Sequence, residues 1–217
     1  MDGELNSSIL GSYEFWNNLY NDEIENFQNH GDVGEIWFGK ETVKRIVKWI
    51  SENPLIKKND SILDLGCGNG MFLVELFKVG FNNLHGVDYS KNAIDLAEGV
   101  SDREDCCINF FVGNILDDIF ESNYSVCLDK GTYDAISLDP EDAKFKRQTY
   151  IENISKLLAE GGFFIITSCN WTDTELTDHF KDLEMVEVIP APVFKFGGKT
   201  GKTVNTVVFK KKQSTEC

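Results

Sequence analysis

The chain has 217 residues, of which 41% are hydrophobic and 26% are charged. These proportions are typical of a soluble globular protein and exclude a largely disordered chain, a collagen-like chain and a coiled coil. The 21 basic and 36 acidic residues give a net charge of −15 at pH 7. Such a charge either serves only solubility or favours a basic protein partner, and it disfavours direct binding of nucleic acid.

The N-terminus and the cysteines indicate the compartment. Residues 1–12 are polar, without the basic and apolar regions of a signal peptide, and we expect them to be flexible. No apolar run reaches the roughly 18–20 residues of a membrane helix. The six cysteines lack zinc-site spacing, which is typical of a reducing compartment, and the three histidines lack metal-ligand spacing. We therefore expect a cytoplasmic protein that binds neither a membrane nor a metal.

Two helices are predicted first along the chain. Apolar residues spaced by three and four predict an amphipathic helix over 13–29 and a second helix that ends near residue 53, and we expect 13–53 to form a helical lid. From residue 61 onward, strand patterns alternate with helix patterns. The predicted strands are 61–65, 84–88, 108–112, 124–129 and 162–169, and the predicted helices are 72–79, 92–100, 144–158 and 175–183.

This alternation predicts an α/β fold. Five strands separated by helices form a parallel sheet with helices on both faces. The last two predicted strands, 185–190 and 204–210, have no helix between them, so we expect them to add an antiparallel hairpin to a seven-stranded, mostly parallel sheet. No linker divides the chain. We therefore expect one domain over 13–212, followed by a tail at 213–217.

A glycine-rich loop follows the first strand of this sheet. Asp64 begins the sequence D-L-G-C-G-N-G, whose glycines permit positive φ angles and a close approach of the backbone to a ligand. A dinucleotide fingerprint would need glycine in place of Met71 or Leu73, so the loop does not fit one. It is instead similar to the cofactor loop of class I S-adenosylmethionine-dependent methyltransferases. The expected cofactor-binding residues here are Asp64, Gly66, Cys67, Gly68, Asn69 and Gly70.

Two further strand ends complete the expected cofactor site. Asp88 lies about 20 residues beyond the loop, a spacing at which a carboxylate can bond ribose hydroxyls. We expect Tyr89 to cover the adenine, although it could equally be an ordinary surface tyrosine. Asn114 and Ile115 follow the third strand, where this class of enzyme often has an aspartate beside the adenine amine. The amide oxygen of Asn114 can accept the same hydrogen bond.

The fourth strand ends in the sequence D-K-G-T, where the methyl acceptor should approach. Enzymes that methylate adenine N6 or glutamine carry [DN]-P-P-[YFW] here, and its absence argues against base and amide acceptors. A carboxylate suits an amine acceptor, because a lysine of pKa near 10.4 must lose a proton before it attacks. We therefore expect Asp129 to contact cofactor and amine, or alternatively to cap the next turn. We expect Tyr133 and Trp171 to act in catalysis and Trp37 to cover the cofactor, although core packing would also explain these aromatics.

Several segments together resemble one family. They are similar to segments of the elongation factor 1-alpha lysine methyltransferases, a branch of the methyltransferase-like proteins, and the resemblance covers roughly residues 13–210. It implies a Rossmann-like class I fold, S-adenosylmethionine as cofactor, a cytosolic setting and a lysine of elongation factor 1-alpha as acceptor. The segments are GDVGEIWFG (31–39), DLGCGNG (64–70), DKGTYDA (129–135), TSCNWT (167–172) and FKFGG (194–198).

The sequence thus predicts a monomeric protein-lysine N-methyltransferase, and two alternatives stay open. A small-molecule amine methyltransferase would need an enclosed acceptor pocket, whereas a folded protein substrate needs an open rim. A binding module that has kept the fold but lost catalysis would bind the cofactor without turnover. Methylation of RNA is disfavoured by the acidic charge.

Overall fold

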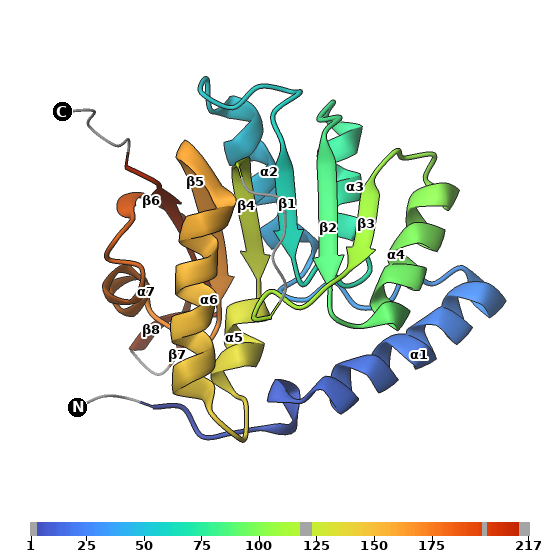
Figure 1. The fold of residues 1–217 in the computed structure, drawn as a ribbon, viewed down its shortest axis with the longest axis horizontal. Helices are drawn as coiled ribbons and strands as arrows, with labels where there is room; N and C mark the ends of the chain where they lie inside the picture. Colours follow the sequence, from blue (N-terminus) through green and yellow to red (C-terminus); the bar gives the residue numbers. More distant parts are fainter. Residues whose placement is uncertain (1–3, 118–122, 197–198, 213–217) are drawn as a thin grey trace.

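A computed structural model describes residues 4–117, 123–196 and 199–212, so the expected tail at 213–217 lies outside the described residues. The main strands are β1 Ile62–Leu65, β2 Leu84–Asp88, β3 Asn109–Val112, β4 Tyr124–Lys130, β5 Leu158–Ser168, β6 Glu184–Ile189 and β9 Asn205–Lys210. They form one seven-stranded sheet in the order β3-β2-β1-β4-β5-β9-β6 (Figure 1). Strand β9 pairs antiparallel with β5 and β6, and the other pairs are parallel, which confirms the predicted sheet and hairpin.

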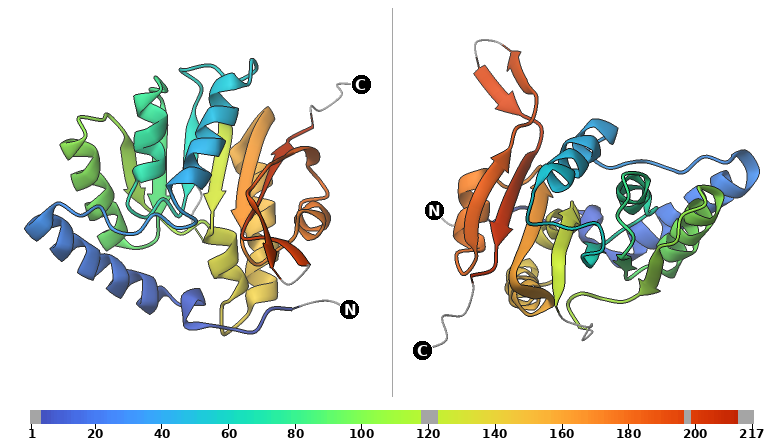
Figure 2. Two further views of the ribbon diagram at one scale, coloured as in Figure 1. Left: turned by 180° about the vertical axis from the view of Figure 1, so that it is seen from behind. Right: turned by 90° about the horizontal axis from the view of Figure 1, so that it is seen from above.

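Helices cover both faces of this sheet. Helices α2, α3 and α4 lie on one face, α6 and α7 lie on the other, and α1 and α5 lie at the end where the parallel strands finish (Figures 1 and 2). The helices are α1 Tyr13–His30, α2 Lys40–Glu52, α3 Met71–Lys78, α4 Lys91–Arg103, α5 Thr132–Ser137, α6 Ala143–Leu157 and α7 Asp173–His179, and a short 3-10 helix, η1, spans Ile9–Gly11.

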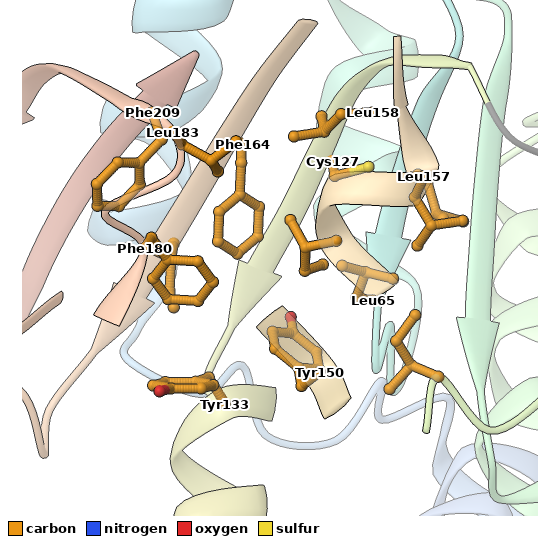
Figure 3. Close-up of a cluster of buried hydrophobic side chains, with 14 of the residues drawn as sticks. Leu65, Cys127, Tyr133, Tyr150, Leu157, Leu158, Phe164, Phe180, Leu183 and Phe209 are labelled. Carbon is orange, nitrogen blue, oxygen red and sulfur yellow. The ribbon is translucent and has the colours of Figure 1, made fainter. Parts of the chain in front are cut away.

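The central strands are buried on both faces, because helices pack against each side. In β1, Ile62 packs among side chains of α2 and α3, whereas Leu63 and Leu65 pack on the opposite face with α6. Figure 3 shows the cluster on the α6 face. In this cluster the rings of Tyr133 and Tyr150 lie with their centroids 5.5 Å apart.

The N-terminal segment packs against the fold, which corrects the expectation of flexibility for its residues 4–12. The backbone N–H of Ser8 donates to the carbonyl of Leu138 at 3.0 Å. A Cβ on Gly11 would lie 2.3 Å from the backbone of Leu138, so this approach requires glycine. The carboxylate of Glu4 binds the buried guanidinium of Arg147 at 2.7 and 2.8 Å. Because all these partners are distant in sequence, local composition could not reveal the contacts.

Two further differences from the prediction lie near strand ends. None of the predicted helices follows β4 directly, but α5 begins there at Thr132. The connection between β6 and β9 contains a two-stranded antiparallel ribbon, β7 Val193–Phe196 and β8 Lys199–Lys202, which extends away from the sheet in Figure 2. Within the described ranges, no helix combines the length and the apolar character needed to cross a bilayer.

Candidate functional site

A cavity of about 700 Å³ opens where the parallel strands end. Its lining includes Gly66, which follows β1, Asp88, which ends β2, and Lys130, which ends β4. Open α/β sheets bind ligands at this edge, and the volume is typical of a site for a cofactor. Helix α1 and the loop over 31–39 form a wall of the cavity through Trp16, Tyr20, Trp37 and Phe38.

The glycine loop is held in place by close backbone contacts. Gly66 and Gly68 have φ angles of +66° and +53°, in the region that favours glycine. A Cβ on Gly66 would lie 2.1 Å from the hydroxyl oxygen of Thr132, and one on Gly68 would lie 2.4 Å from the Tyr20 hydroxyl. The Asn69 side chain donates to the backbone carbonyls of Val33 and Glu35, at 2.9 and 3.2 Å. The loop is therefore fixed both to α5 and to the wall formed by residues 31–39.

Asp88 is anchored by the backbone around it. One carboxylate oxygen accepts the N–H of Gly68 at 3.1 Å, and the other accepts the N–H of Ser90 at 3.0 Å. Burial raises the pKa of Asp88 to about 6, against the opposing effect of these hydrogen bonds. Since a carboxylate has about four acceptor positions, Asp88 can still receive a ligand hydroxyl.

The expected adenine residues lie near Asp88 in the cavity lining. Tyr89 packs edge-on against Tyr13 of α1, with ring centroids 5.1 Å apart. The amide oxygen of Asn114 accepts the N–H of Leu116 at 3.1 Å. Of the residues expected to bind the cofactor, nine line the cavity: Trp37, Gly66, Cys67, Gly68, Asn69, Asp88, Tyr89, Asn114 and Ile115.

Asp64, Gly70 and Asp129, the other three, do not belong to the cavity lining. Asp64 is 2% exposed, and burial raises its pKa to about 7. Gly70 caps α3 in a left-handed conformation, and a Cβ there would lie 2.8 Å from the Phe110 ring. These two residues shape the loop from behind rather than from the cavity.

Asp129 performs the alternative role, that of a cap. Its carboxylate accepts the backbone N–H groups of Thr132 and Tyr133, both at 3.0 Å, and the hydroxyl of Tyr150. The side chain is 1% exposed, and burial raises its pKa to about 7. These contacts favour the alternative that the sequence left open, in which Asp129 caps the turn that begins α5.

Tyr133 and Trp171 also lie beneath the cavity rather than in its lining. The Tyr133 hydroxyl shares a hydrogen bond with His179 Nδ1 at 3.0 Å, and Trp171 Nε1 donates to the Ser137 hydroxyl at 3.0 Å. Their exposed fractions are 1% and 4%. These contacts and this burial favour the core-packing interpretation of both aromatics.

The segments 129–135 and 31–39 contribute side chains to the cavity lining at positions next to the expected ones. Asp134 lines the cavity, and its carboxylate accepts the Ser168 hydroxyl at 2.5 Å and the Cys169 N–H at 2.7 Å. Phe38 lies against Gly131, where a Cβ would be 3.3 Å from the Phe38 ring. Sequence reasoning missed Asp134, although the resembling segment 129–135 contains it. The missing information was the start of α5, which decides which side chains turn toward the cavity.

This arrangement suits S-adenosylmethionine. The cavity offers an aromatic side at Tyr89 for a base, the anchored carboxylate of Asp88 for hydroxyls and, beyond the glycine loop, the cation of Lys130. Among the described residues, no group of three or more histidine, cysteine or acidic side chains is arranged to hold a metal ion.

Comparisons with known proteins agree with this geometry. Residues 56–209 match a family model described as a methyltransferase domain. The EEF1A lysine methyltransferase 2 of Mus musculus is 47% identical over 208 residues, which cover 94% of this chain and 85% of the relative. The protein-lysine N-methyltransferase efm4 of Schizosaccharomyces pombe is 34% identical, over 94% of this chain and 95% of the relative.

Solved structures share the fold at low sequence identity. The N-methyltransferase NodS from Bradyrhizobium japonicum, in complex with S-adenosyl-l-homocysteine, has a TM-score of 0.66 at 18% identity and covers 92% of this chain and 97% of NodS. The [4+2]-cyclase SpnF has a TM-score of 0.70 at 10% identity, over 99% of this chain and 100% of SpnF. Because a cyclase and a methyltransferase both match, the structural likeness establishes the fold, and the reaction must be argued from the sequence relatives and the site.

Proposed function

Since this chain belongs to the methyltransferase family that includes EEF1A lysine methyltransferase 2, we propose that it methylates a lysine of translation elongation factor 1-alpha. The observation that carries this proposal is the 47% identity to a named EEF1A lysine methyltransferase over 94% of the chain. The enzyme is a protein-lysine N-methyltransferase that depends on S-adenosylmethionine. When bound, this cofactor supplies an electrophilic methyl group to the acceptor nitrogen.

The residues around the cavity divide the work of holding the cofactor. Asp88 binds the ribose hydroxyls, and Tyr89, Asn114 and Ile115 enclose the adenine. The backbone of the glycine loop supports the methionyl end, with Asp64 and Gly70 shaping the loop from behind. Trp37, stacked edge-on against Trp16 with centroids 5.0 Å apart, closes the cavity from the side of the helical lid.

Asp134 is the carboxylate best placed for the acceptor amine. It lines the cavity beside the loop that ends β4, where its carboxylate accepts the Ser168 hydroxyl and the Cys169 N–H. Burial raises its pKa, so it is a stronger base than an exposed aspartate. It orients the amine and receives its proton directly or through water. Asp129 acts through Asp134, by capping the helix that carries it, while Tyr133 and Trp171 support that helix from the core.

The remaining partner assignments extend this proposal. The proposal includes a cytoplasmic monomer. It does not bind nucleic acid directly, because its charge of −15 repels phosphates. Light scattering should give a mass near 24.6 kDa, and a stable dimer would refute the monomer.

Label transfer tests the acceptor. Purified chain is incubated with radioactive S-adenosylmethionine and unmodified elongation factor 1-alpha, and mass spectrometry locates the label. We expect label on a lysine with the wild-type chain, a loss of at least about tenfold with Asp134→Asn, and wild-type transfer with Glu141→Gln. Glu141 is the matched control because it lines the same cavity but has an 84% exposed side chain.

Three results would contradict the proposal. Label confined to the small-molecule fraction of an extract would favour an amine methyltransferase. Binding of S-adenosyl-l-homocysteine without transfer to any acceptor would favour a catalytically inactive module. Unchanged transfer by Asp134→Asn would contradict the role of Asp134 toward the amine, but not the assignment of elongation factor 1-alpha as the acceptor.

A further inference from the structure

Lys130 occupies an unusual position at the end of β4. Strand alternation places it on the same face as Val126 and Leu128, which pack toward α2 and α3, and opposite Cys127, which packs toward α6. The β1–β4 register pairs Leu65 with Asp129, so Lys130 lies beside the start of the glycine loop. The side chain lines the cavity, and the strand order places β4 beyond β1 from the strands β2 and β3 that carry the adenine residues.

The ammonium of Lys130 has no direct partner in the chain as described. Its Nζ makes no hydrogen bond or ion pair within residues 4–117, 123–196 and 199–212. Desolvation lowers the pKa of Lys130, and the negative charges of Asp64 and Asp129 oppose that effect. The other lysine of the lining differs, because Lys146 pairs with Asp139 at 2.7 Å. A half-buried cation without a partner is costly unless an anion or another acceptor joins it.

The chemistry of the cofactor identifies the anion that fits. The nucleoside end of S-adenosylmethionine belongs at Asp88, so its amino-acid end reaches the glycine loop beside Lys130. That end carries two cationic groups, the sulfonium and the α-ammonium, and one anionic group, the α-carboxylate. Both cations would be repelled by Lys130, whereas the carboxylate would be attracted.

We propose that Lys130 binds the α-carboxylate of S-adenosylmethionine and so fixes the amino-acid end of the cofactor beside the glycine loop. The proposal concerns cofactor binding and does not depend on which protein is the methyl acceptor, so it can be tested in the absence of elongation factor 1-alpha.

The test compares two ligands that differ in one group. Isothermal titration calorimetry measures the dissociation constants of S-adenosylmethionine and of decarboxylated S-adenosylmethionine, which lacks only the carboxylate. Lys130→Met keeps the length of the side chain and removes the charge. We expect it to weaken S-adenosylmethionine by at least about tenfold, as for a lost charged hydrogen bond. Decarboxylated S-adenosylmethionine should bind this variant as tightly as, or more tightly than, the wild type.

Two further variants separate binding from structure. Lys130→Arg should retain the preference for the carboxylated ligand, and Lys146→Met, the matched control, should leave both dissociation constants unchanged. Equal weakening of both ligands by Lys130→Met would overturn the proposal, because Lys130 would then support the cavity without touching the carboxylate. Unchanged binding of both ligands would overturn it as well. Thermal unfolding of each variant identifies any loss due to misfolding.

Discussion

Replacing Gly68 by alanine tests whether the glycine loop is shaped by contact with α1. The φ angle of Gly68 is +53°, and a left-handed conformation costs an L-residue about 1–2 kcal/mol. The new Cβ would lie 2.4 Å from the Tyr20 hydroxyl, and relief of such overpacking costs typically about 1–3 kcal/mol. We therefore expect Gly68→Ala to lower the free energy of unfolding by about 2–5 kcal/mol, measured by urea denaturation.

The two contributions can be separated by a double-mutant cycle. Tyr20→Phe removes the oxygen that the Cβ would meet, and the next ring atom is 3.3 Å away, a tight but tolerable contact. The second substitution should therefore recover about 1–3 kcal/mol and leave the cost of the φ angle. Gly80→Ala is the matched control, because its φ is +97° and its Cβ would meet nothing closer than 4.0 Å. If Gly68→Ala costs the same with and without Tyr20→Phe, within about 0.5 kcal/mol, the contact with α1 does not shape the loop.

Three further substitutions test the buried charges. Asp129→Ala should lower the free energy of unfolding in urea by about 3 kcal/mol, since it leaves two N–H groups and the Tyr150 hydroxyl without their acceptor. The folded variant should keep its affinity for S-adenosyl-l-homocysteine. Lost affinity at unchanged stability would mean that Asp129 contacts the cofactor. The pKa of Asp64 is raised to about 7, so the folded state retains a proton that the unfolded chain loses near pH 4, and stability contributed by this group falls as pH rises between these values. In thermal unfolding, the free energy of unfolding of Asp64→Asn should rise relative to that of the wild type by at most ~1.4 kcal/mol per pH unit from pH 5 to 7, and should rise no further above pH 8. A difference that does not depend on pH would contradict this. Glu4→Gln should cost about 1 kcal/mol in the same assay, because Glu4 is half-exposed although Arg147 is buried, and an unchanged melting temperature would mean that the N-terminal segment is not held by this pair.

The sequence predicted the sheet and the edge of the site because both depend on local patterns. Apolar runs separated by helical periodicity identify the strands, and D-x-G-x-G-x-G followed by Asp88 identifies the strand ends that hold the cofactor. Contacts between distant segments were invisible to the same reasoning. The approach of Gly11 to Leu138 and the pairing of Glu4 with Arg147 have no local signature, so residues 4–12 looked flexible although they pack against the fold.

The direction in which Asp129 points could not be predicted from the sequence, for a physical reason that lies in β4. Because side chains alternate along a strand, Asp129 points to the face covered by α6 and Lys130 to the face covered by α2 and α3. A shift of one residue therefore decides which charge lines the cavity. In a strand with one solvated face, the polar residues would show which side chains point to which face. Strand β4 is covered by helices on both faces, so its residues 126–128 are all apolar and do not show this. The sequence analysis therefore assigned a function to Asp129 of the D-K-G-T segment, whereas in the structure the adjacent Lys130 lines the cavity.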